Sequence, residues 1–131
     1  MKILADTNTF LAVALGEPGK DWLVEVTVGA DLAAPAMLPH EIGNALSALV
    51  KRRKLRPRQA TDVWDVIRRI PVELVDVDIR AALGLAVQHD IYAYDAYFLQ
   101  CALQLRCPLL TLDRAMRRVA GTLGVKLVEK P

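Results

Sequence analysis

Short apolar segments alternate with longer segments of helical periodicity along this chain. Five segments have the length and apolar character of buried strands: residues 2–5, 31–34, 72–76, 108–112 and 124–128. Such alternation is typical of α/β folds, in which crossover helices connect the strands of a parallel sheet. A chain of 131 residues is also the size of one domain. The sequence therefore predicts a single α/β domain spanning residues 1–131.

The segments between the predicted strands carry the spacing of amphipathic helices. In the clearest one, the apolar residues follow the i, i+3, i+4, i+7, i+8 pattern of one buried face: Ile42, Ala45, Leu46, Leu49 and Val50. Further helices are predicted from Thr7, over 20–28, after Pro57, over 79–87, from about Asp95 to Leu105, and from Asp113 to an exit at Gly121 or Gly124.

Four acidic residues lie where the chain leaves a predicted strand or enters a predicted helix. Asp6 and Asp113 end the first and fourth strands, and Glu41 and Asp95 open helices. Right-handed crossovers bring the carboxyl ends of parallel strands to one edge of the sheet, where ligands collect. If the first strand lies beside the fourth, Asp6 and Asp113 leave that edge side by side. The other two acids then enter the same region from the flanking helices.

Each acid alone also has a structural explanation, because Asp is a favoured N-cap and Glu complements the dipole of a first helical turn. The combination favours a functional role. Asp6 follows a strand that is expected to be buried, so its charge must be paired or bound to a metal. Four neighbouring carboxylates would also repel one another without a cation. Short polar residues that could hold them in position lie nearby: Thr7, Asn8, Asn44 and Thr111.

Carboxylate oxygens are suitable ligands for Mg²⁺ or Mn²⁺. One or two such ions could activate a water molecule and stabilise the leaving oxygen of a phosphodiester. The sequence offers no Ser–His–Asp or Cys–His arrangement and no Gly-rich phosphate loop. His40 is interpreted as a helix-start residue, and Cys101 and Cys107 as reduced core thiols. A metal-dependent nuclease is the leading hypothesis.

Four motifs resemble those of the PIN-domain ribonucleases, and specifically the VapC toxins of toxin–antitoxin pairs. They occur in the family's order: ADTN at 5–8, EIGNAL at 41–46, YDAY at 94–97 and LTLD at 110–113. The resemblance implies an endoribonuclease toxin that uses Mg²⁺ or Mn²⁺. It implies that the ion-binding acids are Asp6, Glu41, Asp95 and Asp113, with Asp6 and Asp95 as direct ligands, supported by Thr7, Asn8, Asn44 and Thr111.

The same resemblance implies a three-layer α/β/α fold around a parallel five-stranded sheet with strand order 3-2-1-4-5. It further implies a homodimer, and a small VapB-type antitoxin whose C-terminal segment blocks the acidic pocket. Because no segment has the pattern of a membrane span or a cleaved leader, we expect a cytoplasmic protein.

The formal net charge of +2 is compatible with nucleic-acid binding but does not demand it. Six basic residues crowd positions 51–58. They could be a solvated turn that complements a helix C-terminus, or a patch that follows RNA phosphates. At 1.5 Å per helical residue, this run lies about 15 Å from Glu41, too far for the scissile phosphate. Arg114, directly after Asp113, is our preferred phosphate contact.

Two other classes of function remain open. A phosphoryl-transfer protein could use Asp6 as a nucleophile, but it would need a lysine near the site late in the chain. The basic residues within 108–118 are all arginines. A non-catalytic module could bind RNA or protein with the same fold. The apolar residues of segment 20–28 and Trp64 are interpreted as core, with a partner surface as the alternative.

Overall fold

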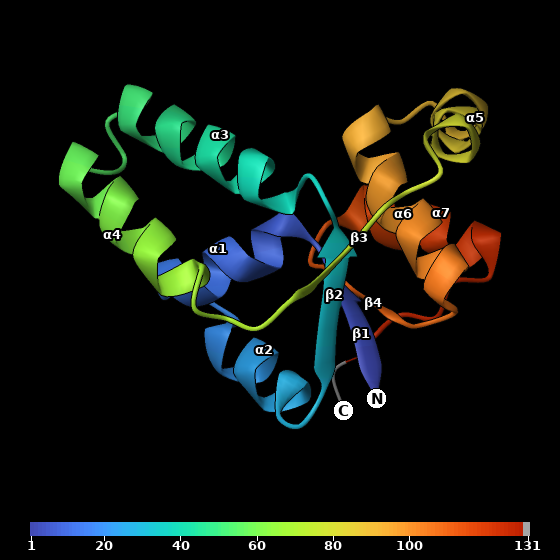
Figure 1. Ribbon diagram of the computed structural model, residues 1–131, viewed down its shortest axis with the longest axis horizontal. Helices are drawn as coiled ribbons and strands as arrows, with labels where there is room; N and C mark the ends of the chain where they lie inside the picture. Colours follow the sequence, from blue (N-terminus) through green and yellow to red (C-terminus); the bar gives the residue numbers. More distant parts are fainter. Residues whose placement is uncertain (130–131) are drawn as a thin grey trace.

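The computed structural model describes residues 1–129 and shows a parallel sheet between two layers of helices (Figure 1). The strands are β1 (Lys2–Ala5), β2 (Asp31–Pro35), β3 (Glu73–Val75) and β4 (Leu109–Leu110). Their order is β3-β2-β1-β4, and each neighbouring pair is parallel. The predicted three-layer α/β fold is therefore confirmed, and the first strand does lie beside the fourth.

The sheet differs from the prediction at the edge formed by β4. This strand covers only Leu109–Leu110 of the predicted 108–112, and segment 124–128 forms a single parallel bridge between Leu127 and Leu109 in place of a fifth strand. The Leu109 amide donates to the Lys126 carbonyl at 2.9 Å. Pro108 has no amide hydrogen to donate to the ladder, although its carbonyl accepts the Leu4 amide at 2.9 Å. The predicted position of the last segment was right and its extent was wrong.

Seven helices connect the strands within residues 1–129: α1 (Thr7–Leu15), α2 (Lys20–Thr27), α3 (Leu38–Lys51), α4 (Pro57–Ile67), α5 (Ile79–His89), α6 (Ala93–Leu105) and α7 (Arg114–Leu123). Helices α1 to α4 lie on one side of the sheet, and α5 to α7 lie on the other (Figure 1). The left-handed Gly124, with φ of 75°, ends α7. None of these helices combines the length and the apolar character needed to cross a bilayer.

Two helices begin earlier than predicted. Helix α3 starts at Leu38 rather than at Glu41, and α6 starts at Ala93 rather than at Asp95. Pro39 is compatible with a first helical turn because the amide that it lacks would have no partner there. Glu41 therefore lies within a first helical turn, as its structural explanation required. Asp95 also lies within a first turn and is not an N-cap.

The core is centred on the neighbouring strands β1 and β4 and on α6. Ile3, Leu4, Leu109 and Leu110 are fully buried. Helix α6 lies on the side of the sheet that α5 to α7 cover and contributes five buried residues: Ala96, Phe98, Leu99, Cys101 and Ala102. The interpretation of the two cysteines is confirmed in that both are buried and free. Burial raises the pKa of Cys101 to about 12, which keeps this group a thiol.

Helix α2 and Trp64 mostly belong to the core, as interpreted. Leu23 is buried, and Trp22 and Val26 pack against the same small cluster as Ile3. Trp64 packs against the main core. Val24 and Val28 are exposed and leave a limited apolar surface on α2.

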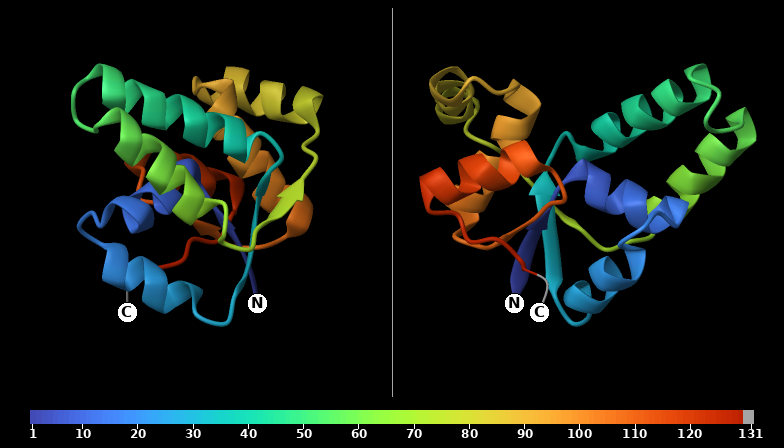
Figure 2. Two further views of the ribbon diagram at one scale, coloured as in Figure 1. Left: turned by 60° about the vertical axis from the view of Figure 1, so that its left-hand side comes forward. Right: turned by 180° about the vertical axis from the view of Figure 1, so that it is seen from behind.

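Helices α3 and α4 form a hairpin that projects away from the sheet. Helix α3 begins at the carboxyl end of β2 and runs outward, and α4 returns beside it (Figures 1 and 2). The loop over residues 52–56 that joins them lies at the outer end of this hairpin (Figure 2). One helix therefore connects the edge of the sheet with a distant part of the surface.

Candidate active site

Four acidic side chains line one small pocket of about 40 Å³ at the carboxyl edge of the sheet. Its walls are formed by Asp6, Thr7, Asn8, Glu41, Asp95, Phe98, Asp113 and Met116. Asp6 follows β1 and Asp113 lies beyond β4, and these strands are paired through Ala5 and Leu110. The structure thus brings the four predicted acids together, whereas their role in catalysis stays a prediction.

The side chain of Asp6 is buried, with 3% of its surface exposed, and it accepts three hydrogen bonds. Its Oδ1 accepts the backbone N–H of Thr9 at 2.9 Å and the Thr9 hydroxyl at 2.6 Å. Its Oδ2 accepts the hydroxyl of Thr111. Asp6 is therefore also the N-cap of α1. The sequence analysis missed Thr9, although the third residue after an N-cap Asp is where such a bond is expected.

Thr111 connects Asp6 with Asp113. Its hydroxyl is fully buried, donates to Asp6, and accepts the backbone N–H of Asp113 at 3.0 Å. The Oδ1 of Asp113 accepts the backbone N–H of Met116 at 2.9 Å and caps α7. The capping explanation is therefore correct for Asp6 and Asp113, and both also line the pocket. One buried hydroxyl fixes the positions of these two acids relative to each other.

Glu41 and Thr7 carry the free hydrogen-bonding capacity of the pocket. Glu41 Oε2 and Thr7 Oγ1 are buried, and neither atom has a hydrogen-bond partner of good geometry. The Thr7 hydroxyl nevertheless interacts with the Glu41 carboxylate and lowers its pKa, which offsets part of the increase that burial causes. A buried carboxylate oxygen without a donor is costly, so this atom is suited to a ligand.

Not every predicted supporting residue reaches the pocket. Thr7 and Asn8 line it, but Asn44 is exposed on α3 and is absent from its walls. Arg114 is exposed and lines a neighbouring pocket of about 320 Å³, not the acidic one. In that pocket Arg117 is paired with Glu129 at 2.8 Å. His40 is exposed and likewise does not line the acidic pocket, in agreement with its interpretation as a helix-start residue.

The pocket is unfavourable for its own negative charge. Burial, the largest effect in each case, raises the pKa values of Asp6, Glu41 and Asp95. Neighbouring carboxylates add to this: Asp113 acts on Asp6 and Asp95, and Asp95 acts on Glu41. Hydrogen bonds from Thr111 and Thr9 oppose the rise of the Asp6 pKa. A bound cation would relieve both the burial penalty and the repulsion.

The donor set fits a hard divalent cation. Mg²⁺ and Mn²⁺ prefer oxygen ligands, and Mg²⁺ keeps several of its waters, so one or two direct carboxylate ligands can suffice. Among residues 1–129, no three acidic, His or Cys side chains are already arranged to chelate an ion.

Asp95→Asn tests the repulsion within the pocket. The raised pKa of Asp95 means that ionisation destabilises the metal-free fold as pH rises above the unfolded value near 3.9. We expect the variant to be more stable than the unaltered protein at pH 7, by a few tenths to about 1 kcal/mol after solvent screening. The difference should shrink as pH falls through the unfolded value and vanish at about pH 3, where Asp95 is protonated in both states. Urea unfolding in EDTA measures it, with the exposed Asp62→Asn on α4 as control. An equal difference in the free energy of unfolding at both pH values would contradict a repulsive effect of the Asp95 charge.

Comparison with known proteins adds the family. The PIN domain family model matches residues 3–122. A similar protein, Ribonuclease VapC3 of Pyrobaculum aerophilum, is 25% identical over 121 residues, which cover 88% of this chain and 92% of the relative.

Similar solved structures establish the fold but, at such low identity, nothing further. PAE2754 of Pyrobaculum aerophilum has a TM-score of 0.70 and 18% identity, covering 91% of this chain and 79% of that one. VapBC2 of Rickettsia felis, bound to a promoter DNA fragment, has a TM-score of 0.70 and 14% identity, covering 98% of each chain. FitAcB of Neisseria gonorrhoeae has a TM-score of 0.63 and 18% identity, covering 97% and 96%. Since the family match spans nearly the whole sequence and agrees with the motifs and the sheet topology, the chain belongs to the PIN-domain family.

Proposed function

We propose that this protein is a Mg²⁺- or Mn²⁺-dependent endoribonuclease and the toxin of a toxin–antitoxin pair. The observation that carries the proposal is the pocket into which four carboxylates converge from four separate segments of the chain. Burial and mutual repulsion raise the pKa values of three of them, and a bound cation would stabilise their ionised forms. The similarity to a protein named Ribonuclease VapC3 supports RNA as the substrate.

In this proposal the residues divide the work according to their surroundings. Asp6 and Asp95 hold the ion, and Thr9 and Thr111 keep Asp6 in place. Glu41, with its unpartnered Oε2 and raised pKa, accepts a proton from the attacking water. Asp113 completes the acidic wall, which has enough carboxylates for one or two ions. When bound, Mg²⁺ or Mn²⁺ supplies Lewis acidity and lowers the pKa of a water ligand.

Use of Asp6 as a phosphorylated nucleophile is less compatible with this geometry. Both carboxylate oxygens accept hydrogen bonds, and the residue is 3% exposed, so neither oxygen is presented for attack on phosphorus. The fixed position of this carboxylate supports the proposed role of Asp6 as a ligand.

The proposal includes a homodimer and a VapB-type antitoxin as partners. Helix α5 exposes Ile79, Leu83 and Val87 at spacings of four residues, with exposed fractions of 57%, 54% and 77%. An apolar stripe of this kind on a surface helix supports protein association. The names of two similar structures, VapBC2 and FitAcB, support an antitoxin as one such partner.

Removal of divalent ions tests the proposal directly. Purified protein dialysed against EDTA is expected to lose at least about 100-fold of its cleavage rate on bulk transfer RNA, because charge neutralisation and water activation are lost together. Addition of Mg²⁺ or Mn²⁺ in excess of EDTA should restore the rate. EDTA already saturated with Mg²⁺ is the control. Undiminished cleavage in EDTA, measured by gel electrophoresis of end-labelled RNA, would exclude the metal-dependent mechanism.

A further inference from the structure

The outer end of the α3–α4 hairpin carries a dense group of cations, here called the basic tip. It consists of Lys51, Arg52, Arg53, Lys54, Arg56 and Arg58, all of which are exposed. No ion pair joins any of them to an acid within residues 1–129. The chain also contains no acidic residue between Glu41 and Asp62. The tip is therefore not a patch of balanced surface charge.

The basic tip accounts for the whole positive excess of the chain. The sequence has 17 basic and 15 acidic residues, so without these six cations the remainder would have 11 basic residues and a formal charge of −4. A polyanion approaching the rest of the surface, and the acidic pocket above all, would be repelled. It would be attracted at the tip.

Helix stabilisation explains only part of the tip. Lys51 ends α3, where a cation complements the helix dipole. Arg56 lies instead at the N-cap of α4, and Arg58 lies in its first turn. This first turn contains no acid. Cations at a helix N-terminus oppose the dipole, so two members of the tip are in unfavourable positions for stability. Helix stability therefore does not explain the placement of these two cations.

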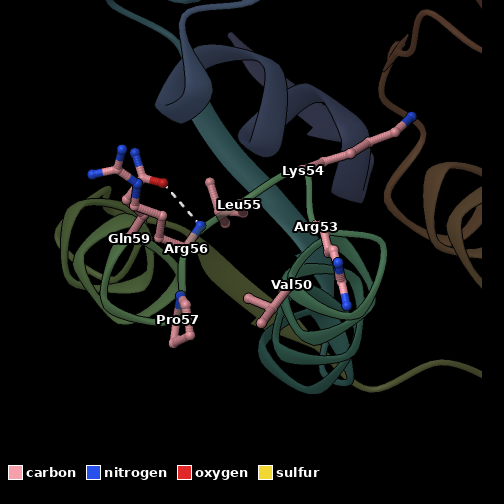
Figure 3. A pocket seen from close by; sticks show the side chains of 7 residues that line it. All are labelled: Val50, Arg53, Lys54, Leu55, Arg56, Pro57 and Gln59. Carbon is pink, nitrogen blue, oxygen red and sulfur yellow. Dashed lines mark hydrogen bonds between the residues drawn. The ribbon is translucent and has the colours of Figure 1, made fainter.

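The tip is a structured turn that surrounds an open pocket. The pocket, of about 660 Å³, is lined by Val50, Arg53, Lys54, Leu55, Arg56, Pro57 and Gln59 (Figure 3). Arg53 adopts the left-handed conformation with φ of 57°. The backbone N–H of Lys54 donates to the Leu49 carbonyl at 2.9 Å, and that of Arg56 to the Gln59 side chain at 2.9 Å. The charged ends of Arg53, Lys54 and Arg56 extend outward in different directions (Figure 3).

Helix α3 sets a fixed distance between the tip and the acidic pocket. Glu41 lies in its first turn and Lys51 at its end, a separation of about 15 Å at 1.5 Å per residue. The tip cannot touch a phosphate held at the acids. It can bind phosphates of the same strand several nucleotides away, or of a neighbouring strand in a folded RNA.

We propose that the basic tip binds the phosphate backbone of the RNA substrate at a position remote from the bond that is cut. This inference rests on the proposed function, which makes RNA the ligand. The six cations of the tip lie at the outer end of the hairpin whose first helix begins beside the pocket with Glu41. A single polyanion could therefore contact both the tip and the pocket. An acidic segment of a partner protein is the competing ligand, and the experiment below separates the two.

The test compares two variants of equal charge in the Asp95→Asn background, which permits binding without cleavage. The tip variant carries Arg52→Gln, Arg53→Gln, Lys54→Gln and Arg58→Gln. The control carries four dispersed changes at exposed positions, Lys20→Gln, Arg69→Gln, Arg80→Gln and Lys126→Gln. Affinity for bulk transfer RNA is measured by filter binding between 50 and 200 mM KCl, and circular dichroism verifies the fold of both.

The tip variant is expected to lose about 10-fold or more in affinity. The slope of log K against log[salt] should become shallower for this variant. Its magnitude should fall by about 0.7 for each single-strand phosphate that the tip no longer neutralises. The control should lose about 2- to 3-fold, from long-range attraction alone. Equal losses in the two variants, or no loss in either, would overturn the proposal. So would a tip variant that retains RNA affinity but no longer binds a poly-glutamate peptide.

Failure of this inference is distinguishable from failure of the proposed function. If the unaltered protein cleaves transfer RNA and the tip variant, with Asp95 intact, cleaves it with the same KM and kcat, the tip proposal alone is wrong. If the tip proposal is right, KM should rise by about 10-fold or more with kcat little changed, because the tip lies too far away to act on the chemical step. If the protein binds RNA through the tip but cleaves none, the function is wrong and the surface assignment stands.

Discussion

Asp6→Asn and Asp95→Asn are each expected to reduce RNA cleavage by at least about 100-fold at saturating Mg²⁺, comparable to the removal of one strong electrostatic interaction with a transition state. The amide keeps the shape of the carboxylate but lacks the charge that attracts the ion. Cleavage of end-labelled transfer RNA under single-turnover conditions measures the effect. Both acids line the pocket, and Asp6 is the most buried of the four acids.

Asp95→Asn is the cleaner of the two substitutions. Asp6 accepts hydrogen bonds from Thr9 and Thr111, so an amide group at this position would face a hydroxyl that now donates to a carboxylate. A loss of activity in Asp6→Asn could thus include a change in local structure. The matched control is Asp62→Asn, an exposed acid on α4 that should leave the rate unchanged. Wild-type cleavage by a double variant lacking both carboxylates would exclude the assigned site.

Thr111→Val is expected to weaken Mn²⁺ binding by about 10- to 100-fold although Thr111 is not a proposed ligand. Valine has nearly the same shape but neither donates to Asp6 nor accepts from the Asp113 amide. The buried Asp6 carboxylate and the partly buried Asp113 amide would each lose a partner, so the free energy of unfolding should also fall by about 1–3 kcal/mol. Mn²⁺ affinity by isothermal titration calorimetry and stability by urea unfolding give the two readouts.

The conservative variant separates positioning from simple stability. Thr111→Ser keeps the hydroxyl and is expected to retain most of the Mn²⁺ affinity, although it leaves a small cavity where the methyl group was fully buried. A Thr111→Val protein that is destabilised but binds Mn²⁺ as well as the unaltered protein would show that Thr111 serves the fold alone. In that case Asp6 would not need this hydrogen bond to hold an ion.

The amino-acid sequence determined the local elements and the identity of the acids. The spacing of Ile42, Leu46 and Leu49 was enough to predict α3, because helical periodicity depends only on near neighbours in the chain. The apolar segments beginning at Lys2 and Asp31 predicted β1 and β2 for the same reason. The positions of Asp6 and Asp113 after strands followed directly. Parallel topology predicted that these two acids would meet if the first strand lay beside the fourth, an order that the family resemblance implied and the structure confirms.

Only the tertiary structure decided how the pocket is completed. The partners of Asp6 are Thr9, three residues away, and Thr111, which lies 105 residues further along. Asn44 was predicted to support the acids, yet the orientation of α3 turns it to solvent. The last predicted strand is reduced to one bridge at Leu127. Side-chain direction, burial and the pKa shifts that follow depend on contacts between distant segments, and no local pattern of residues encodes those contacts by itself.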